Sequence, residues 1–344
     1  MTIEALVGIR AVRSWLPPDR VSARQAVTGE VLTAEQAEAH GEVAVGIATD
    51  DDPPVEMAAR ACVQALRAAG CDAQAVDLLL YSWTNYQGND FFSPQHWLAD
   101  RLGLSGRCNP VTVQQACNGA AATLELAIGA VRSGRAGTAL IAAGDRFGAP
   151  GLDHWRSHPM LAHGDGAVAA VVAAPAPADE FHVLGLAHAA AADLWRTRDT
   201  GKLALPGRQV PDFIDSRPTE IFLALGGRDL LLRRGTESMH AAVTACLDEA
   251  GGIPLEKVDA VLLPRLSPGV RRLMVGVYEE HFGPAAHSYY SRTGHLGSGD
   301  LLANLADVVE DDLVAPGGLA LLLNAGGGYS YSAALVRRGP KTCH

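Results

Sequence analysis

The stretch "MAARACVQALRAAGCDAQAVDLLLY", residues 57–81, has a counterpart later in the chain, "MHAAVTACLDEAGGIPLEKVDAVLL", residues 239–263. In both, apolar residues at helical spacing run up to a glycine, Gly70 or Gly251. After a short loop, an aspartate then precedes an apolar strand. The two glycines lie 181 residues apart. The chain therefore contains one helix–loop–strand unit twice.

A second pair of segments repeats at the same offset. "GTALIAAGD", residues 137–145, matches "GLALLLNAG", residues 318–326. Two matches at one offset indicate an internal duplication. We therefore expect an α/β fold of two similar halves, residues 1–175 and 180–344, related by a pseudo-twofold axis.

A cysteine stands at a predicted strand-to-helix junction, in "QQACNGAAATLELA", residues 114–127. An apolar strand at Val111 and Val113 precedes Cys117, and an alanine-rich helix follows it. Such a cysteine is either a small core residue or a nucleophile whose thiolate is stabilised by the N-terminus of the helix.

The repeat places a second turn opposite this cysteine. Adding the offset to Cys117 gives residue 298, inside "RTGHLGSGDLLANLADVVEDD", residues 292–312. This is also a glycine-rich turn that opens a helix. If the two halves pack about a pseudo-twofold axis, Cys117 faces His295 and Asp300. The alternatives are a surface turn histidine and a helix-capping carboxylate.

Two glycine-rich turns complete the candidate site. "NAGGGYSYSAALVR", residues 324–337, places three glycines between apolar strands, where a backbone N–H can point at a developing oxyanion. A tight hairpin is the alternative. "LAHGDGAVAAVV", residues 161–172, is a similar turn before a strand and carries His163.

The composition excludes several classes of protein. The net charge of −10 argues against nucleic-acid binding, and no run of 18 apolar residues indicates a membrane span. The six cysteines include no C-x-x-C pair, and the start "MTIEALVGIRAVRSWLPP" has no signal-peptide pattern. We expect a cytoplasmic protein with free thiols, and no metal site.

Three segments together resemble a known family. "ACNGAAATLELAIGAVRSG", "HGDGAVAAVV" and "NAGGGYSYSAALV" are similar to the signature segments of ketoacyl synthase III enzymes of the thiolase superfamily, and the similarity covers nearly the whole chain. The resemblance implies a thiolase-like fold, a homodimer and Cys117 as the residue that takes up an acyl group. It also implies an oxyanion hole made by the N–H groups of Gly327 and Cys117.

The sequence departs from the condensing members of that family at three places. Their catalytic histidine lies in a segment that here resembles "PRLSPGVRR", with Arg265 in its place. Their asparagine is replaced by His295 in "GHLG". The stretch "R-T-G-I", associated with coenzyme A, is not visible in "HGEVAVGIATDDD". The acyl donor is then a thioester of a carrier protein or of coenzyme A, with no other cofactor. Because that stretch is missing, we expect an acidic carrier protein or a free thioester to serve as donor, without a strict requirement for coenzyme A.

These departures favour acyl transfer over condensation. Cys117, His295 and Asp300 form the set of nucleophile, base and orienting carboxylate that acyl transfer to an alcohol requires. The sequence is similar to the branch of the family that forms esters on small-molecule natural products. The alternatives are a condensing enzyme in which His163 or another histidine replaces the missing one, and a non-catalytic acyl-binding protein.

Two further sets of residues are predicted to meet substrates or partners. We expect His163, Phe91 and Phe92 to line the acceptor pocket. An acidic carrier protein requires a local basic patch, and the candidate residues are Arg233, Arg234, Arg271 and Arg272.

Overall fold

The computed structural model describes residues 4–89, 91–148, 151–198, 221–327 and 329–341. Ten strands form one mixed sheet in the order β10-β9-β11-β12-β8-β1-β7-β6-β4-β5. The first five in chain order are β1 (Val7–Trp15), β4 (Leu78–Ser82), β5 (Asn109–Val113), β6 (Thr138–Asp145) and β7 (Gly166–Ala173). The others are β8 (Phe181–Ala190), β9 (Ala260–Leu262), β10 (Ala286–His287), β11 (Leu319–Gly326) and β12 (Ser330–Arg338).

The strand order shows the expected duplication. From the edge to the centre, the first half runs β5-β4-β6-β7-β1 and the second half runs β10-β9-β11-β12-β8. Antiparallel pairing of β1 with β8 joins the two halves at the centre of the sheet. The predicted α/β fold of two similar halves is confirmed, whereas the boundaries at residues 175 and 180 stay a prediction.

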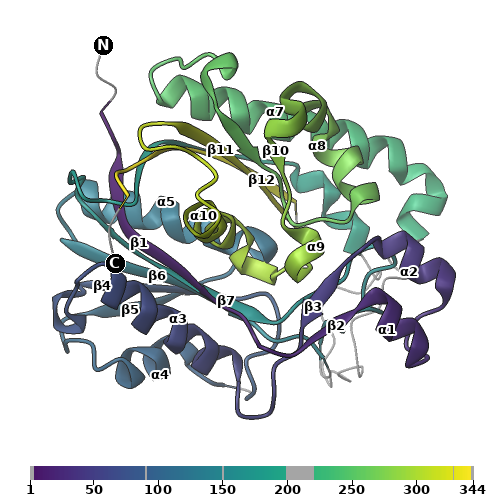
Figure 1. Ribbon diagram of the computed structural model, residues 1–344, viewed down its shortest axis with the longest axis horizontal. Coiled ribbons are helices and arrows are strands. Elements are labelled where there is room, and N and C mark those ends of the chain that lie inside the picture. Colours follow the sequence, from purple (N-terminus) through teal and green to yellow (C-terminus); the bar gives the residue numbers. More distant parts are fainter. Residues whose placement is uncertain (1–3, 90, 149–150, 199–220, 328, 342–344) are drawn as a thin grey trace.

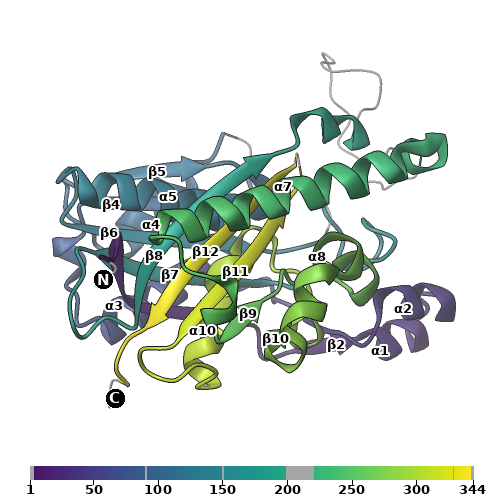
Figure 2. The same ribbon diagram turned by 90° about the horizontal axis from the view of Figure 1, so that it is seen from above.

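The helices occupy equivalent places in the two halves. Those of the first half are α3 (Pro54–Ala68), α4 (Pro94–Arg101) and α5 (Gly119–Arg132). Those of the second are α7 (Arg228–Glu249), α8 (Pro268–Phe282), α9 (Tyr290–Thr293) and α10 (Asp300–Glu310). Helix α3 covers the outer face of the first half of the sheet and α7 that of the second, whereas α5 and α10 lie against the inner face, between the two halves (Figures 1 and 2).

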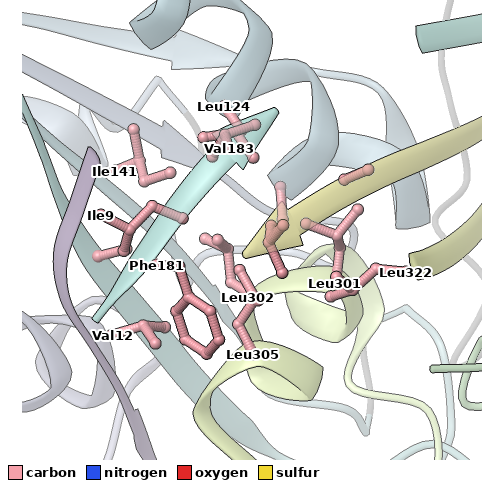
Figure 3. Close-up of a cluster of buried hydrophobic side chains, with 14 of the residues drawn as sticks. Ile9, Val12, Leu124, Ile141, Phe181, Val183, Leu301, Leu302, Leu305 and Leu322 are labelled. Atoms are coloured by element: carbon pink, nitrogen blue, oxygen red, sulfur yellow. The ribbon is translucent and has the colours of Figure 1, made fainter. Parts of the chain in front are cut away.

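The central core forms around α5 and α10. Leu301, Leu302 and Leu305 of α10 lie in one buried cluster with Leu124 of α5, facing strands of both halves (Figure 3). Burial of most of their surface explains why both helices are largely apolar, with only one face of α5, at Glu125 and Leu126, exposed. Since each of the two helices follows a predicted functional turn, this packing brings the two turns together.

A small segment between β1 and α3 packs beside the turns that carry His163 and His295. It contains β2 (Arg20–Ser22), α1 (Ala23–Thr28), α2 (Ala34–His40) and β3 (Ala44–Gly46). Its apolar side chains form a cluster with Leu161 and Tyr290, which precede the turns of His163 and His295. None of the helices in the described residues has the length and apolar character that crossing a membrane requires.

Candidate active site

Cys117 lies in a single helical turn, Ala116–Asn118, directly before α5. The preceding residue, Ala116, has a φ of +46°, a left-handed conformation that costs energy for any residue with a Cβ. Strained turns of this kind place a nucleophile at the start of a helix. The strand-turn-helix arrangement expected around Cys117 is present.

The turn that carries His295 is held against the turn that carries His163. His295 N–H donates to Ala162 O at 2.9 Å, and Gly164 N–H donates to His295 O at 3.0 Å. A Cβ on Gly164 would lie 1.9 Å from Thr293 O, so only glycine permits this approach. The two glycine-rich turns therefore fix each other's backbone.

Asp300 orients the imidazole of His295. Its Oδ2 lies 2.6 Å from His295 Nδ1, and its Oδ1 accepts the Leu296 N–H at 2.8 Å. Both side chains are almost fully buried. With Nδ1 directed at the carboxylate, Nε2 is the ring nitrogen left for the Cys117 thiol, with which His295 forms a hydrogen bond.

The electrostatic environment favours a thiolate–imidazolium pair. Burial opposes the thiolate of Cys117, but the charge and hydrogen bond of His295 and a hydrogen bond from Gly327 lower its pKa below the ordinary value. Burial also opposes the imidazolium of His295, but Asp300 and Cys117 raise its pKa well above the usual range. Both shifts favour the form in which His295 holds the proton and the Cys117 sulfur is a thiolate.

The glycine loop packs directly on the nucleophile turn. A Cβ on Gly326 would lie 2.7 Å from Asn118 N, so the turn and the end of β11 approach more closely than any other residue would allow. The next residue is Gly327, whose backbone hydrogen-bonds to the Cys117 sulfur. This places the Gly327 N–H where negative charge develops when Cys117 reacts.

The three predicted pocket residues are placed differently. The His163 ring is buried and lies 5.5 Å from the His295 ring, between centroids, in an edge-to-face contact. Phe91 is fully exposed, with a left-handed φ of +56°, and Phe92 is half-buried against the cluster around α3 and α4. The His163 side chain thus lies beside His295, whereas the Phe91 side chain, in the loop before α4, points away from the core of this chain.

Arg265 occupies a structural position. Its Nη1 donates to Thr293 Oγ1 at 2.7 Å, its Nε donates to Asn304 Oδ1 at 3.0 Å, and its Nη2 forms an ion pair with Asp307. The side chain is 1% exposed. Each of its guanidinium nitrogens is thus engaged with α10 or with the residues just before the His295 turn, so Arg265 braces this turn.

Four buried polar residues near the site were not found from the sequence. Asn118, Asn324 and Ser332 hydrogen-bond to one another beneath Cys117. Asp145, at the end of β6, accepts hydrogen bonds from the Ser298 N–H at 2.9 Å and from the Thr84 and Asn85 N–H groups at 2.7 Å. Their partners lie 60 to 214 residues away, so no local pattern marks them.

Across the described residues, no group of three or more histidine, cysteine, aspartate or glutamate side chains is arranged to hold a metal ion. The groups that the site presents are the thiol of Cys117, the imidazole of His295, the carboxylate of Asp300 and backbone N–H groups.

Comparison with known families gives two matches in the order of the chain. Residues 111–190 match the family described as 3-oxoacyl-[acyl-carrier-protein] synthase III. Residues 252–338 match its C-terminal domain. The two matches contain Cys117 and the glycine loop, as well as the turns of His163 and His295.

Individual relatives span most of the chain. The mycobacterial beta-ketoacyl-[acyl-carrier-protein] synthase III of Mycobacterium avium (strain 104) is 25% identical over 85% of this chain and 84% of its own length. The structure named ChlB3, an acyltransferase, is 29% identical, with a TM-score of 0.87 over 97% of this chain and 98% of its own. OleA of Xanthomonas campestris with bound lauric acid and lauroyl-CoA shares the fold, with 17% identity and a TM-score of 0.75 over 98% of this chain and 100% of its own.

The fold and the site together define a class of protein, the thiolase-like proteins with a cysteine at the start of a central helix. The chain belongs to the ketoacyl synthase III-like family of that superfamily. This membership supports an enzyme that transfers or condenses acyl groups.

Proposed function

We propose that the protein is an acyltransferase that moves an acyl group from a thioester, through acyl-Cys117, to a hydroxyl of a small-molecule natural product. The observation that carries the proposal is the buried relay of Asp300, His295 and Cys117, with His295 Nδ1 2.6 Å from Asp300. The acyltransferase name of ChlB3, a relative across nearly the whole chain, supports the same assignment.

In the first step, the Cys117 thiolate attacks the carbonyl carbon of the donor thioester. The oxyanion that forms accepts hydrogen bonds from the backbone N–H groups of Gly327 and Cys117. When the bond from carbon to the donor sulfur breaks, the leaving thiolate takes the proton of the His295 imidazolium. The products are acyl-Cys117, a free donor thiol and a neutral His295.

In the second step, His295 acts as the base. The thiolate of Cys117 is one of the charges that raise the pKa of His295, and acylation removes it. The neutral imidazole then takes the proton of the acceptor hydroxyl while its oxygen attacks the acyl carbon. The ester leaves and the Cys117 thiolate returns beside the protonated His295, so the cycle closes without another proton donor.

Condensation is the second candidate, because relatives in the family are named ketoacyl synthases. Condensation requires donors that hold a malonyl thioester carbonyl while an enolate forms. Arg265 stands at the position of one such donor, and its guanidinium is engaged by Thr293, Asn304 and Asp307. These contacts favour transfer over condensation.

The donor and the assembly are part of the proposal. A carrier protein fits the family name, although Arg234 and Arg271 of the predicted basic patch are paired with Asp193 and Glu279, which makes the patch as a whole less positive. We also propose a homodimer, because β5 forms an edge of the sheet that a second copy can extend. Free thiols favour a cytoplasmic location.

Mass spectrometry of the intact protein tests the proposal. The protein is incubated with a panel of acyl-carrier-protein and acyl-coenzyme A thioesters, and the acyl group is mapped by peptide analysis. We expect one acyl group on Cys117, discharged on addition of an alcohol acceptor. Acylation of another residue, or an acyl-Cys117 that no alcohol discharges, would contradict it.

A further inference from the structure

A buried cluster of three polar side chains lies directly beneath the nucleophile. We call Asn118, Asn324 and Ser332 the amide cluster, and each of them is 0% exposed. They come from the nucleophile turn, from β11 and from β12, so the cluster joins the start of α5 to both strands that flank the glycine loop. The acyl-transfer steps above give it no chemical role.

The hydrogen bonds of Asn324 have a defined direction. Its amide nitrogen donates to Cys117 O at 3.1 Å and to Asn118 Oδ1 at 2.9 Å, which uses both of its N–H bonds. Among the described residues, no donor meets its Oδ1. Burying an unsatisfied oxygen lowers stability, so a side chain selected for packing alone would be apolar here. Asn324 therefore acts through its two N–H donors.

The other end of the cluster is anchored on β8. Asn118 Nδ2 donates to Ser332 Oγ at 2.6 Å. The Ser332 hydroxyl lies 2.7 Å from His188 Nδ1 and 3.0 Å from Asn118 Oδ1. Burial lowers the pKa of His188 and so disfavours its charged form. The other ring nitrogen lies 3.2 Å from Glu125 Oε2 without a hydrogen bond between them, so the chain of donors and acceptors runs from Cys117 to His188 on β8.

This series of hydrogen bonds connects the nucleophile turn to the strand that leads into the glycine loop. On one side it restrains the carbonyl of Cys117, which follows the strained residue Ala116. On the other it restrains β11 three residues before Gly327, where Gly326 already packs against Asn118. The distance from the Cys117 sulfur to the Gly327 N–H thus depends on the Asn324 side chain.

We propose that Asn324 is a positioning residue, which through the amide cluster sets the Gly327 N–H at the distance the oxyanion requires. This inference rests on the proposed function in one respect, since it takes Cys117 as the group that is acylated. The inference goes beyond the proposed function because it assigns the placement of the oxyanion-binding Gly327 N–H to a side chain that does not contact the substrate.

Two reactions of Cys117 separate this role from general support of the fold. Acylation by p-nitrophenyl acetate passes through an oxyanion: sulfur bonds to the carbonyl carbon and p-nitrophenolate leaves with the bonding electrons. Alkylation by iodoacetamide displaces iodide and forms no oxyanion. Alkylation depends on the thiolate, whose pKa is lowered mainly by His295 and to a smaller extent by the Gly327 hydrogen bond. It is therefore measured at a pH at which Cys117 is fully ionised, where its rate does not depend on the placement of Gly327.

The experiment compares Asn324→Ala and Ser332→Ala with the wild-type protein in both reactions. We expect acylation, followed as the burst of p-nitrophenolate, to slow by about 10- to 100-fold in Asn324→Ala. Ser332→Ala should slow it less, and alkylation should keep its wild-type rate in both. In the double variant the loss should equal that of Asn324→Ala alone, because both act through one chain of hydrogen bonds.

Thr123→Val is the matched control, because it removes a buried hydroxyl of α5 that bonds only within its helix. It should leave both reactions unchanged. Equal losses of acylation and alkylation would show that Asn324 merely supports the turn, and unchanged acylation in both variants would also overturn the inference. If Asn324→Ala does not fold, Ser332→Ala decides alone. A wild-type protein that shows no burst would instead remove the proposed function itself.

Discussion

The nucleophile turn, residues 116–118, and the histidine turn, residues 295–300, stand at equivalent places in the two halves. Each lies at the start of a central helix, α5 or α10, and each is held by the end of a strand from the other half. Asp145 at the end of β6 accepts the Ser298 N–H of the histidine turn. Near the end of β11, Asn324 donates to the carbonyl of Cys117.

The surroundings of the two turns are opposite in sign. The Cys117 sulfur is met by the Gly327 N–H and by His295, which stabilise an anion. His295 is met by the Asp300 carboxylate, which stabilises a cation, and the turn itself is braced by Asp145. One scaffold used twice thus gives an anion site and a cation site that face each other, as a nucleophile and its base require.

The largest expected effect comes from removing the Cys117 thiolate. Cys117→Ala should abolish acyl loading entirely, measured by intact-protein mass, and should leave the fold unchanged, measured by circular dichroism. Burial raises the pKa of Cys62, Cys71, Cys108 and Cys246, so none of them can replace it. Cys108→Ala is the control and should load normally. Acyl-protein on Cys117→Ala would remove the nucleophile assignment.

Removing the His295 imidazolium should separate the loading of Cys117 from the transfer of its acyl group to an alcohol. In His295→Asn the pKa of Cys117 rises because the imidazolium is lost, so loading and iodoacetamide alkylation should need a higher pH than in wild type. Transfer to an alcohol should fall by about 10²- to 10⁴-fold and should not recover at higher pH, because no base remains. Both are followed by pulse-labelling and chase. Wild-type transfer in His295→Asn would exclude the base role.

The brace of the histidine turn should show in stability. Burial raises the pKa of Asp145 from 3.8 to about 6 in the folded protein. The folded state therefore takes up a proton as the pH falls through 6, and wild type should gain stability relative to Asp145→Asn. The gain should reach about 2 kcal/mol between about pH 7 and about pH 4.5, measured by urea unfolding of both proteins. A difference that does not change with pH would contradict the raised pKa.

The orienting carboxylate should matter least. Asp300→Asn keeps the size of the side chain but removes the charge that stabilises the His295 imidazolium. We expect a smaller loss in transfer than in His295→Asn, measured by the same pulse-labelling and chase, because Asp300 orients the ring and does not itself take the proton. A loss equal to that of His295→Asn would mean that Asp300 does more than orient the ring.

Much of the fold and part of the candidate site are visible in the sequence. The repeat, read at Gly70 and Gly251, predicts the duplicated strand order, and its offset brings Cys117 to the turn of His295 and Asp300. This works because the duplication preserves the order of the elements, and two equivalent helices then meet at the centre.

Other parts leave no local signal. Asn118 and Ser332 are 214 residues apart and meet only because β12 passes under the nucleophile turn. Phe91 has a left-handed backbone and a fully exposed side chain, and no local pattern in the sequence predicts that direction; its place in the acceptor pocket stays a prediction. Contacts between the halves, and the direction of single side chains in loops, depend on the assembled structure.

The fate of the acyl group on wild-type Cys117 tests the central claim most directly. Loaded protein is offered an alcohol acceptor and a malonyl thioester together, and ester and carbon dioxide are measured in the same reaction. Acyl transfer predicts ester formation without carbon dioxide release, because His295 replaces the asparagine of the condensing members and Arg265 is held by Thr293, Asn304 and Asp307. Release of carbon dioxide with a ketoacyl product and no ester would contradict it.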